Sequence, residues 1–340
     1  MTTTRHRTRG RAATPALLLT AGAAVSALAL AGCAAETGST STATGTTSGT
    51  ASAAYPVTVT SCGQDFTYDE APSRVVLGSY RTFETLDALG VAGSVHGYLL
   101  GPDDDGVAPT DLPDDLVMVS ADTIPAREPV IAAEPDLFLS YNEAQLTGEG
   151  TLSYDDLSGI GANAYVMGAY CAQDPDNLTI DSVYADITAL GAIYDVPERA
   201  SELNDELRAR VATAEDSLDG STATVAVLKV IGGTVYAIGG YPAAAILSAL
   251  GLTNQFADLA TAYAELSTEQ ALAMDPDVVL VNYVGDEQTA IDQLATLLPD
   301  LPAVQDGRVY GADESPAQGG GVGIIDSLES IATDVAAATR

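Results

Sequence analysis

The sequence contains no tryptophan, only four phenylalanines and only two histidines. One histidine, His6, lies near the start of the chain, which leaves His96 alone in the remainder. A zinc or manganese site built from several histidines is therefore not expected. No Gly-x-Ser-x-Gly motif occurs either, so the nucleophile elbow of a hydrolase is missing. We expect neither an enzyme nor a resident metal or cofactor.

Basic residues are also scarce. After Cys33 the chain carries nine Lys and Arg against 47 Asp and Glu, a balance of −38. Such a surface repels nucleic acid and anionic lipid headgroups, so neither is an expected partner. Solubility or a salty habitat is enough to explain the charge.

The N-terminus has the pattern of an exported lipoprotein. Four arginines precede an apolar run from Ala16 to Leu30, which is short for a stable membrane span and typical of a signal peptide. The small residues before Cys33 match the lipobox of bacterial lipoproteins, in which that cysteine is lipidated; the alternative is an unprocessed anchor. We predict a signal peptide over residues 1–32 and a lipid anchor at Cys33 as the only membrane attachment, on the outer face of the cytoplasmic membrane.

Two further features follow Cys33. Residues 34–54 are almost entirely Ala, Ser, Thr and Gly, a composition that cannot bury a core, so 33–54 is predicted to be a flexible tether. The remaining cysteines, Cys62 and Cys171, form an even pair in an oxidising compartment. We predict that they form a disulfide; two buried free thiols are the alternative.

A long amphipathic helix is predicted near the middle of the chain. Asp195 suits the N-cap, Pro197 the first turn and Gly220 the stop, with apolar residues on one face between them. Strands and helices alternate on both sides, which is typical of mostly parallel sheets. We expect this helix to act as the single rigid link between two α/β lobes with separate cores. The predicted domains are residues 55–195, 196–219 and 220–340.

An internal recurrence supports two lobes. Residues 77–80 resemble 238–241 at an offset of 161, and residues 128–136 resemble 269–277 at an offset of 141. Ligands of open α/β sheets lie beyond the carboxyl ends of the strands, so residues that follow strands are candidate ligand contacts. Ordinary packing of the tyrosines and surface ion pairs of the arginines are the alternatives. The candidates are Tyr80, Arg81, Tyr98, Arg127, Tyr141, Tyr241 and Tyr283.

Several motifs together resemble a known family. The lipobox and tether belong to them, with the segments Ala71–Val76, Thr82–Gly90, Glu128–Asp136, Thr268–Asp277 and Leu301–Tyr310. In order and spacing they are similar to the substrate-binding lipoproteins of iron-siderophore and cobalamin ABC importers. The resemblance implies two Rossmann-like lobes joined by one long rigid helix, the class III periplasmic binding protein fold.

The resemblance also implies a function. Glu128 and Glu269 match the family positions, one on each lobe, that dock onto basic residues of the permease dimer; helix capping is the alternative for both carboxylates. We expect a monomer that captures an Fe(III)-siderophore chelate and delivers it to an ABC permease dimer with its ATPase. Cobalamin or another large cofactor as the ligand, and a role as a surface sensor, are the alternative hypotheses.

Overall fold

Strands and helices alternate through most of the chain, which confirms the predicted α/β class. The computed structural model describes residues 55–101, 109, 112–148, 150–171, 179–259 and 261–339. The predicted signal peptide (1–32) and the tether (33–54), with the lipidation site Cys33, lie outside these residues. The described chain belongs to one compact unit, Ser52–Arg340. Nowhere in its described part does a helix reach the length and apolarity that crossing a membrane requires.

The N-terminal half (residues 55–195) contains a parallel five-stranded sheet of order β5-β4-β3-β6-β7 and an antiparallel hairpin, β1-β2. Its strands are β1 (Val57–Ser61), β2 (Gln64–Tyr68), β3 (Val75–Leu77), β4 (Val95–Leu99), β5 (Val117–Ser120), β6 (Leu137–Ser140) and β7 (Asn163–Val166). Its helices are η1 (Tyr80–Thr82), α1 (Phe83–Ala88), η2 (Ala92–Ser94), α2 (Arg127–Ala132), η3 (Glu143–Leu146), α3 (Tyr154–Gly159), η4 (Gly168–Tyr170) and α4 (Asp181–Ile193), where η marks a 3₁₀ helix.

The C-terminal half (residues 220–339) contains a mixed sheet of order β11-β9-β8-β12-β13, with β10 also beside β8. Its strands are β8 (Thr224–Ile231), β9 (Thr234–Ile238), β10 (Thr253–Asn254), β11 (Tyr263–Glu265), β12 (Val278–Tyr283) and β13 (Val309–Asp313). Its helices are α6 (Ala243–Ala249), α7 (Thr268–Leu272), α8 (Glu287–Leu297), α9 (Pro302–Gln305), η5 (Pro316–Gly319) and α10 (Gly323–Ala338).

The internal recurrence is only partly reflected in the sheets. β8 lies beside β12 as β3 lies beside β6, so β8 holds the place of β3. The offset of 161 pairs β3 instead with β9, which forms an antiparallel hairpin with β8. That pairing of strands is wrong, because short apolar strands that end in glycine look alike in either direction. The offset of 141 pairs α2 and β6 with α7 and β12, which do occupy matching places.

The predicted central helix is α5 (Pro197–Asp216), whose 20 residues span about 30 Å. Its N-cap is Val196, which has no side-chain capping bond, so the expected cap at Asp195 is wrong. Asp195 instead has φ 55° in the turn that ends α4, where the Val196 amide donates to the Gly191 carbonyl. A Cβ at Gly191 would lie 2.3 Å from the Ala200 Cβ, so this glycine allows α4 and α5 to approach closely.

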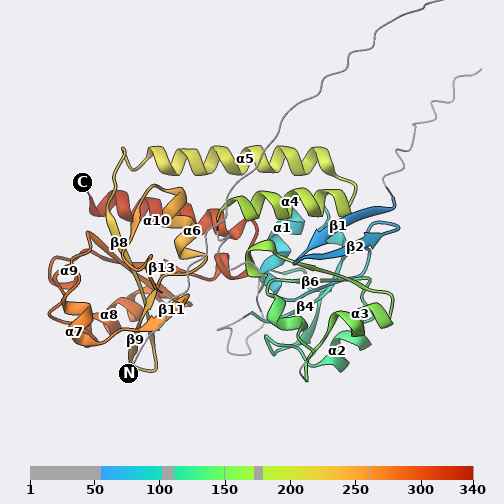
Figure 1. The fold of residues 1–340 in the computed structure, drawn as a ribbon, viewed down its shortest axis with the longest axis horizontal. Coiled ribbons are helices and arrows are strands. Elements are labelled where there is room, and N and C mark those ends of the chain that lie inside the picture. The colour runs from blue at the N-terminus through green and yellow to red at the C-terminus, as the bar shows by residue number, and fades with distance from the viewer. Residues whose placement is uncertain are drawn as a thin grey trace, which may run out of the picture. The chain divides into compact units, whose positions relative to one another are not determined.

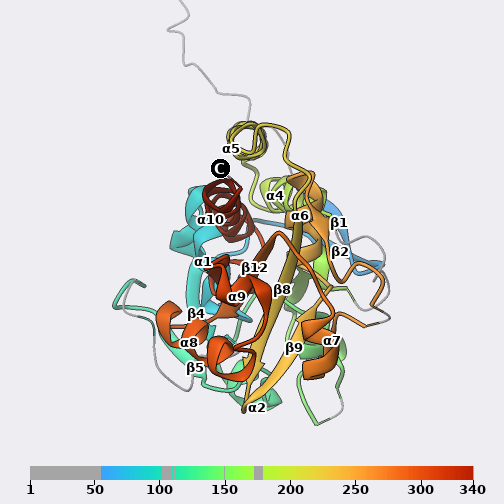
Figure 2. The ribbon, with the colours of Figure 1, turned by 90° about the vertical axis from the view of Figure 1, so that its left-hand side faces the viewer.

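Each half has a buried apolar cluster of its own, and a third cluster joins the two halves. One cluster of buried apolar side chains includes Leu77 of β3 and Leu280 of β12, and continues through α4, α5 and α10. Figures 1 and 2 show α5 lying along α4 and α10 rather than standing alone. The chain passes from one half to the other through α5, as predicted, and α5 packs along α4 in one half and α10 in the other. The exact domain boundaries remain a prediction.

Candidate functional site: a cavity between the two sheets

A cavity of about 520 Å³ lies where segments from the two sheets meet. Tyr80 and Arg81 follow β3, and Ser315 and Pro316 follow β13, so both sheets contribute the segments beyond the carboxyl ends of their strands. This is the position in which open α/β sheets bind ligands. We call it the cleft cavity. Its remaining lining residues are Phe83, Glu84, Asp87, Leu112 and Asp326.

The start of η1 brings three of the predicted ligand residues together. The Ser79 hydroxyl caps this turn by accepting from the Arg81 amide. The Arg81 guanidinium carbon lies 4.7 Å from the centre of the Tyr80 ring, and the Tyr98 ring meets Tyr80 edge-on at 6.4 Å. Tyr98 is only 6% exposed, so it supports Tyr80 from within the core.

The charge of the cleft cavity differs from the sequence-based picture. Among the described residues, its lining contains the carboxylates of Glu84, Asp87 and Asp326 but only one basic side chain, Arg81, and Asp326 pairs with Arg210 behind it at 2.5 Å. The second predicted arginine, Arg127, pairs with Asp156 at 2.8 Å and does not line this cavity. A clasp of two arginines around an anionic ligand is therefore not assembled here.

A glycine-rich seam joins the two halves beside the cavity. A Cβ at Gly319 would lie within 2.6–2.7 Å of Arg81, and one at Gly321 would lie 2.0 Å from the Thr85 hydroxyl. The Val322 amide donates to that same Thr85 hydroxyl at 3.2 Å. These glycines let the backbone of one half touch the other.

A second cavity, of about 550 Å³, lies at the carboxyl ends of β8, β12 and β13. The Lys229 ammonium forms an ion pair with Glu314, and the Asn282 amide donates to the other Glu314 oxygen at 3.1 Å. Tyr283 lines this second cavity, and its pKa is raised, mainly by burial and then by Asp313. Glu314 immediately precedes Ser315 of the cleft cavity, so one segment contributes to both.

Two further predicted tyrosines meet around a residue that the sequence did not single out. Tyr170 of η4 contacts Tyr141 edge-on at 6.2 Å and Tyr241 at 5.0 Å, and its hydroxyl lies 3.4 Å from the Ala317 carbonyl, to which it donates. Burial raises the pKa of the Tyr170 hydroxyl well above its usual range. This tyrosine junction packs one half against the other. Only its aromatic character marks Tyr170 in the sequence.

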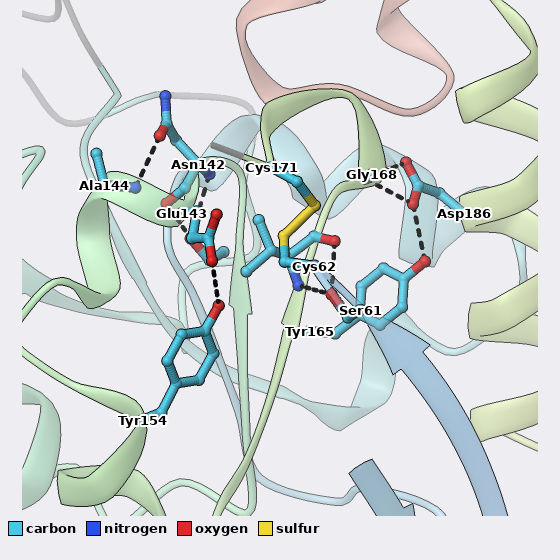
Figure 3. Close-up of a disulfide and its surroundings, with 12 residues drawn as sticks. Ser61, Cys62, Asn142, Glu143, Ala144, Tyr154, Tyr165, Gly168, Cys171 and Asp186 are labelled. Atoms are coloured by element: carbon cyan, nitrogen blue, oxygen red, sulfur yellow. Dashed lines mark hydrogen bonds between the residues drawn. A yellow bond between two sulfur atoms is a disulfide. The ribbon is translucent and has the colours of Figure 1, made fainter. Parts of the chain in front are cut away.

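Two anchors hold η4 in place (Figure 3). Cys171, directly after η4, forms a disulfide with Cys62, whose sulfurs lie 2.08 Å apart. On the other side, the buried Asp186 carboxylate accepts from the Gly168 amide at 2.9 Å and from the Tyr165 hydroxyl at 2.8 Å. Burial raises the pKa of Asp186 to about 7, although both hydrogen bonds lower it.

The two candidate docking glutamates occupy equivalent places. Glu128 lies in the first turn of α2 and Glu269 in the first turn of α7, and both side chains are exposed. Neither carboxylate makes a side-chain hydrogen bond or ion pair within the described ranges. Figure 1 shows α2 and α7 both on the side away from α5. Both glutamates are therefore available to a partner.

No group of three or more His, Cys, Asp or Glu side chains suited to hold a metal ion occurs among the residues that the structure describes. Aromatic rings, hydroxyls and charged side chains occur in the described linings of both cavities. Volumes of about 520 and 550 Å³ fall within the ~300–1,000 Å³ typical of small-molecule sites.

Comparison with known proteins identifies the class. Residues 75–316 match the family described as periplasmic binding protein, and the chain belongs to this family. Its members are transport components that bind ligands outside the cytoplasm and are not enzymes, so the predicted family and the absence of an enzymatic role are confirmed. No curated protein sequence matches the chain.

Solved structures agree with the family. An ABC-type Fe3+-hydroxamate transport protein from Saccharomonospora viridis DSM 43017 is 29% identical, with a TM-score of 0.66 over 82% of this chain and 99% of that one. A periplasmic heme-binding protein from Roseiflexus sp. RS-1 is 21% identical (TM-score 0.64; 79% and 99% covered). A petrobactin-binding protein from Bacillus subtilis is 18% identical (TM-score 0.65; 83% and 98% covered). The last two show the fold alone.

Proposed function

We propose that the protein is the lipid-anchored, monomeric substrate-binding component of an ABC importer and captures a ferric siderophore in the cleft cavity. The observation that carries the proposal is a cavity walled by segments that follow β3 and β13, in a member of this family. The similarity to a Fe3+-hydroxamate transport protein supports an iron chelate as the cargo.

The charge of the cleft cavity narrows the class of chelate. Of the three carboxylates in the described lining, Asp326 pairs with Arg210, so Glu84 and Asp87 remain against the single guanidinium of Arg81. This lining disfavours a ligand with several negative charges and tolerates a neutral or cationic chelate. Ferric tris-hydroxamates are neutral or cationic, and ferric tris-catecholates carry three negative charges. The aromatic ring of Tyr80 and the Ser315 hydroxyl suit a ligand with both apolar and polar faces. We therefore favour a hydroxamate.

In this proposal the loaded protein docks on the permease through one glutamate of each half. Glu128 and Glu269 are exposed on equivalent helices, as a two-point contact with a permease dimer requires. The packed helices α4, α5 and α10 keep the cavity walls preorganised, so little ordering entropy is lost on binding. The permease then separates the two walls to release the chelate.

Ligand binding to the purified protein tests this proposal. Because the chain lacks tryptophan, intrinsic tyrosine fluorescence reports on residues such as Tyr80. We expect ferrioxamine E, a neutral ferric tris-hydroxamate, to bind about a hundredfold more tightly than ferric enterobactin, a tris-catecholate. Binding of heme or cobalamin in place of both would show that the siderophore assignment is wrong.

A pair of variants tests the charge argument. Replacing Glu84→Gln and Asp87→Asn together removes two carboxylates from the lining, so the affinity for ferric enterobactin should rise about tenfold while that for ferrioxamine E changes little. Asp155→Asn removes one exposed carboxylate from α3 and is the matched control. An unchanged preference in the double variant would contradict the electrostatic account.

A further inference from the structure

Large apolar side chains that reach solvent are concentrated on the two chain segments that contain the docking glutamates. Seven such residues are exposed in the described chain, and five of them lie on two short segments, 117–132 and 263–272. The five are Val117 (51% exposed), Met118 (43%), Ile124 (42%), Tyr263 (62%) and Leu272 (39%). Packing within the fold does not explain why these positions are apolar, because each side chain is exposed to solvent.

The two segments have the same architecture. In each, an edge strand leads into the helix that carries the glutamate: β5 precedes α2, and β11 precedes α7. Within the described sheets β5 pairs only with β4, and β11 pairs only with β9, so the outer edge of each strand lacks a neighbouring strand. Exposed apolar edge strands invite contact with another chain unless a partner covers them.

We infer that each edge strand and the docking glutamate on the helix that follows it in the chain form one composite contact for the permease. We call this contact an apolar docking edge. The first edge is Val117, Met118 and Ile124 with Glu128; the second is Tyr263 and Leu272 with Glu269. The inference rests on the proposed function. It adds that the partner presents apolar side chains next to each basic group, so the docking energy does not come from charge alone.

Charge argues for this occupant over two others. The segments 117–132 and 263–272, which contain the docking edges, have one basic residue, Arg127, and four acidic ones: Asp122, Glu128, Glu265 and Glu269. An anionic lipid surface is therefore repelled. A second copy of this chain would bring two bodies of about −38 charge together at the same patches. A partner with basic and apolar groups fits both edges.

Uptake in cells of the source organism, with the chromosomal copy deleted and variants supplied in its place, tests the inference. The probe is 55Fe-labelled ferrioxamine E. The variant Val117→Thr/Met118→Gln keeps a strand-compatible side chain at 117, and Tyr263→Thr/Leu272→Gln alters the second edge. Each should lower uptake about tenfold at limiting protein, because about two partly buried apolar contacts are lost. Affinity of the purified variants for ferrioxamine E and their unfolding temperature should match the wild type.

Controls separate this inference from the proposed function. Ile160→Gln changes an equally exposed apolar residue outside both edges and should transport normally. Normal uptake by both edge variants, with loss in Glu128→Ala/Glu269→Ala, would overturn the apolar docking edges and leave the glutamate docking intact. Equal loss in Ile160→Gln would also overturn them, because the effect would not be localised. Normal uptake by the glutamate variant would refute docking at these helices altogether.

Discussion

The two halves hold the segments that follow their outer strands by different chemistry. In the N-terminal half, η4 is tied by a disulfide and by the buried Asp186 carboxylate. In the C-terminal half, which contains no cysteine, the corresponding positions after the strands are held by ion pairs and hydrogen bonds around Glu314 and Asp326. The segment after β7 is therefore fixed covalently, and the segment after β13 is held by charge.

The disulfide should give the largest effect. It links residues 109 apart in the sequence, so its removal by Cys62→Ser/Cys171→Ser should lower the free energy of unfolding by about 4 kcal/mol, through the freedom gained by the unfolded chain. Urea unfolding of the variant and of oxidised and reduced wild type measures this. An unchanged urea midpoint after reduction would refute the claim that the disulfide stabilises the N-terminal half.

Asp186 should give the next effect, and its sign depends on pH. The pKa of Asp186 is raised from 3.8 to about 7, so between these values the folded protein keeps a proton that the unfolded chain has lost. The contribution of Asp186 to stability is therefore fully present below pH ~4 and is lost as pH rises to ~7. Asp186→Asn should abolish this pH-dependent loss relative to wild type.

The control for this prediction lies in the C-terminal half. The pKa of Asp334 is raised to about 6, first by burial and then by Glu287, but the residue is only half-buried. Asp334→Asn should therefore flatten the same part of the pH profile less than Asp186→Asn does. Thermal unfolding from pH 4 to pH 8 would measure both. An equal effect of the two variants would show that the buried carboxylate of the N-terminal half contributes no more to the pH dependence of stability than the half-buried one of the C-terminal half.

The smallest effect is expected at α5. Arg210 joins α5 to α10 by contacts of 2.5 Å with Asp326 and 2.6 Å with Glu329, but the arginine is partly exposed. Arg210→Ala should therefore lower stability by only about 1 kcal/mol, and 1 M salt should reduce that difference. Arg199→Ala, which affects the contact with the Ala88 carbonyl of the N-terminal half, is the comparison and should cost less, because its acidic partners are more exposed.

The regular elements could be predicted from the sequence because their patterns are local. The apolar face of α5 and the run of β12 show their periodicity without reference to any partner. The N-cap at Val196 could not be predicted, since it depends on the tight packing of Gly191 against Ala200. β5 and β11 were missed because exposed apolar residues at a sheet edge do not alternate with polar ones.

The site was predictable where it follows the rule for strand ends. Tyr80 and Arg81 line the cleft cavity as that rule suggests, and the same rule would have found Ser315 and Pro316. The pairing of Lys229 with Glu314, 85 residues away, could not be read from spacing. The other predicted ligand contacts do not line the cleft cavity, and the role of each in binding stays a prediction. They are Arg127, Tyr98, Tyr141, Tyr241 and Tyr283.

The glycine seam has a consequence for how wide the cavity can open. Gly319 and Gly321 place the backbone of the C-terminal half directly on Arg81 and Thr85, with no side chain of their own between the halves. A single methyl group at residue 319 would act as a spacer and wedge the cavity walls apart without touching the cargo. The separation of the cavity walls therefore depends on the absence of a side chain at Gly319 and Gly321.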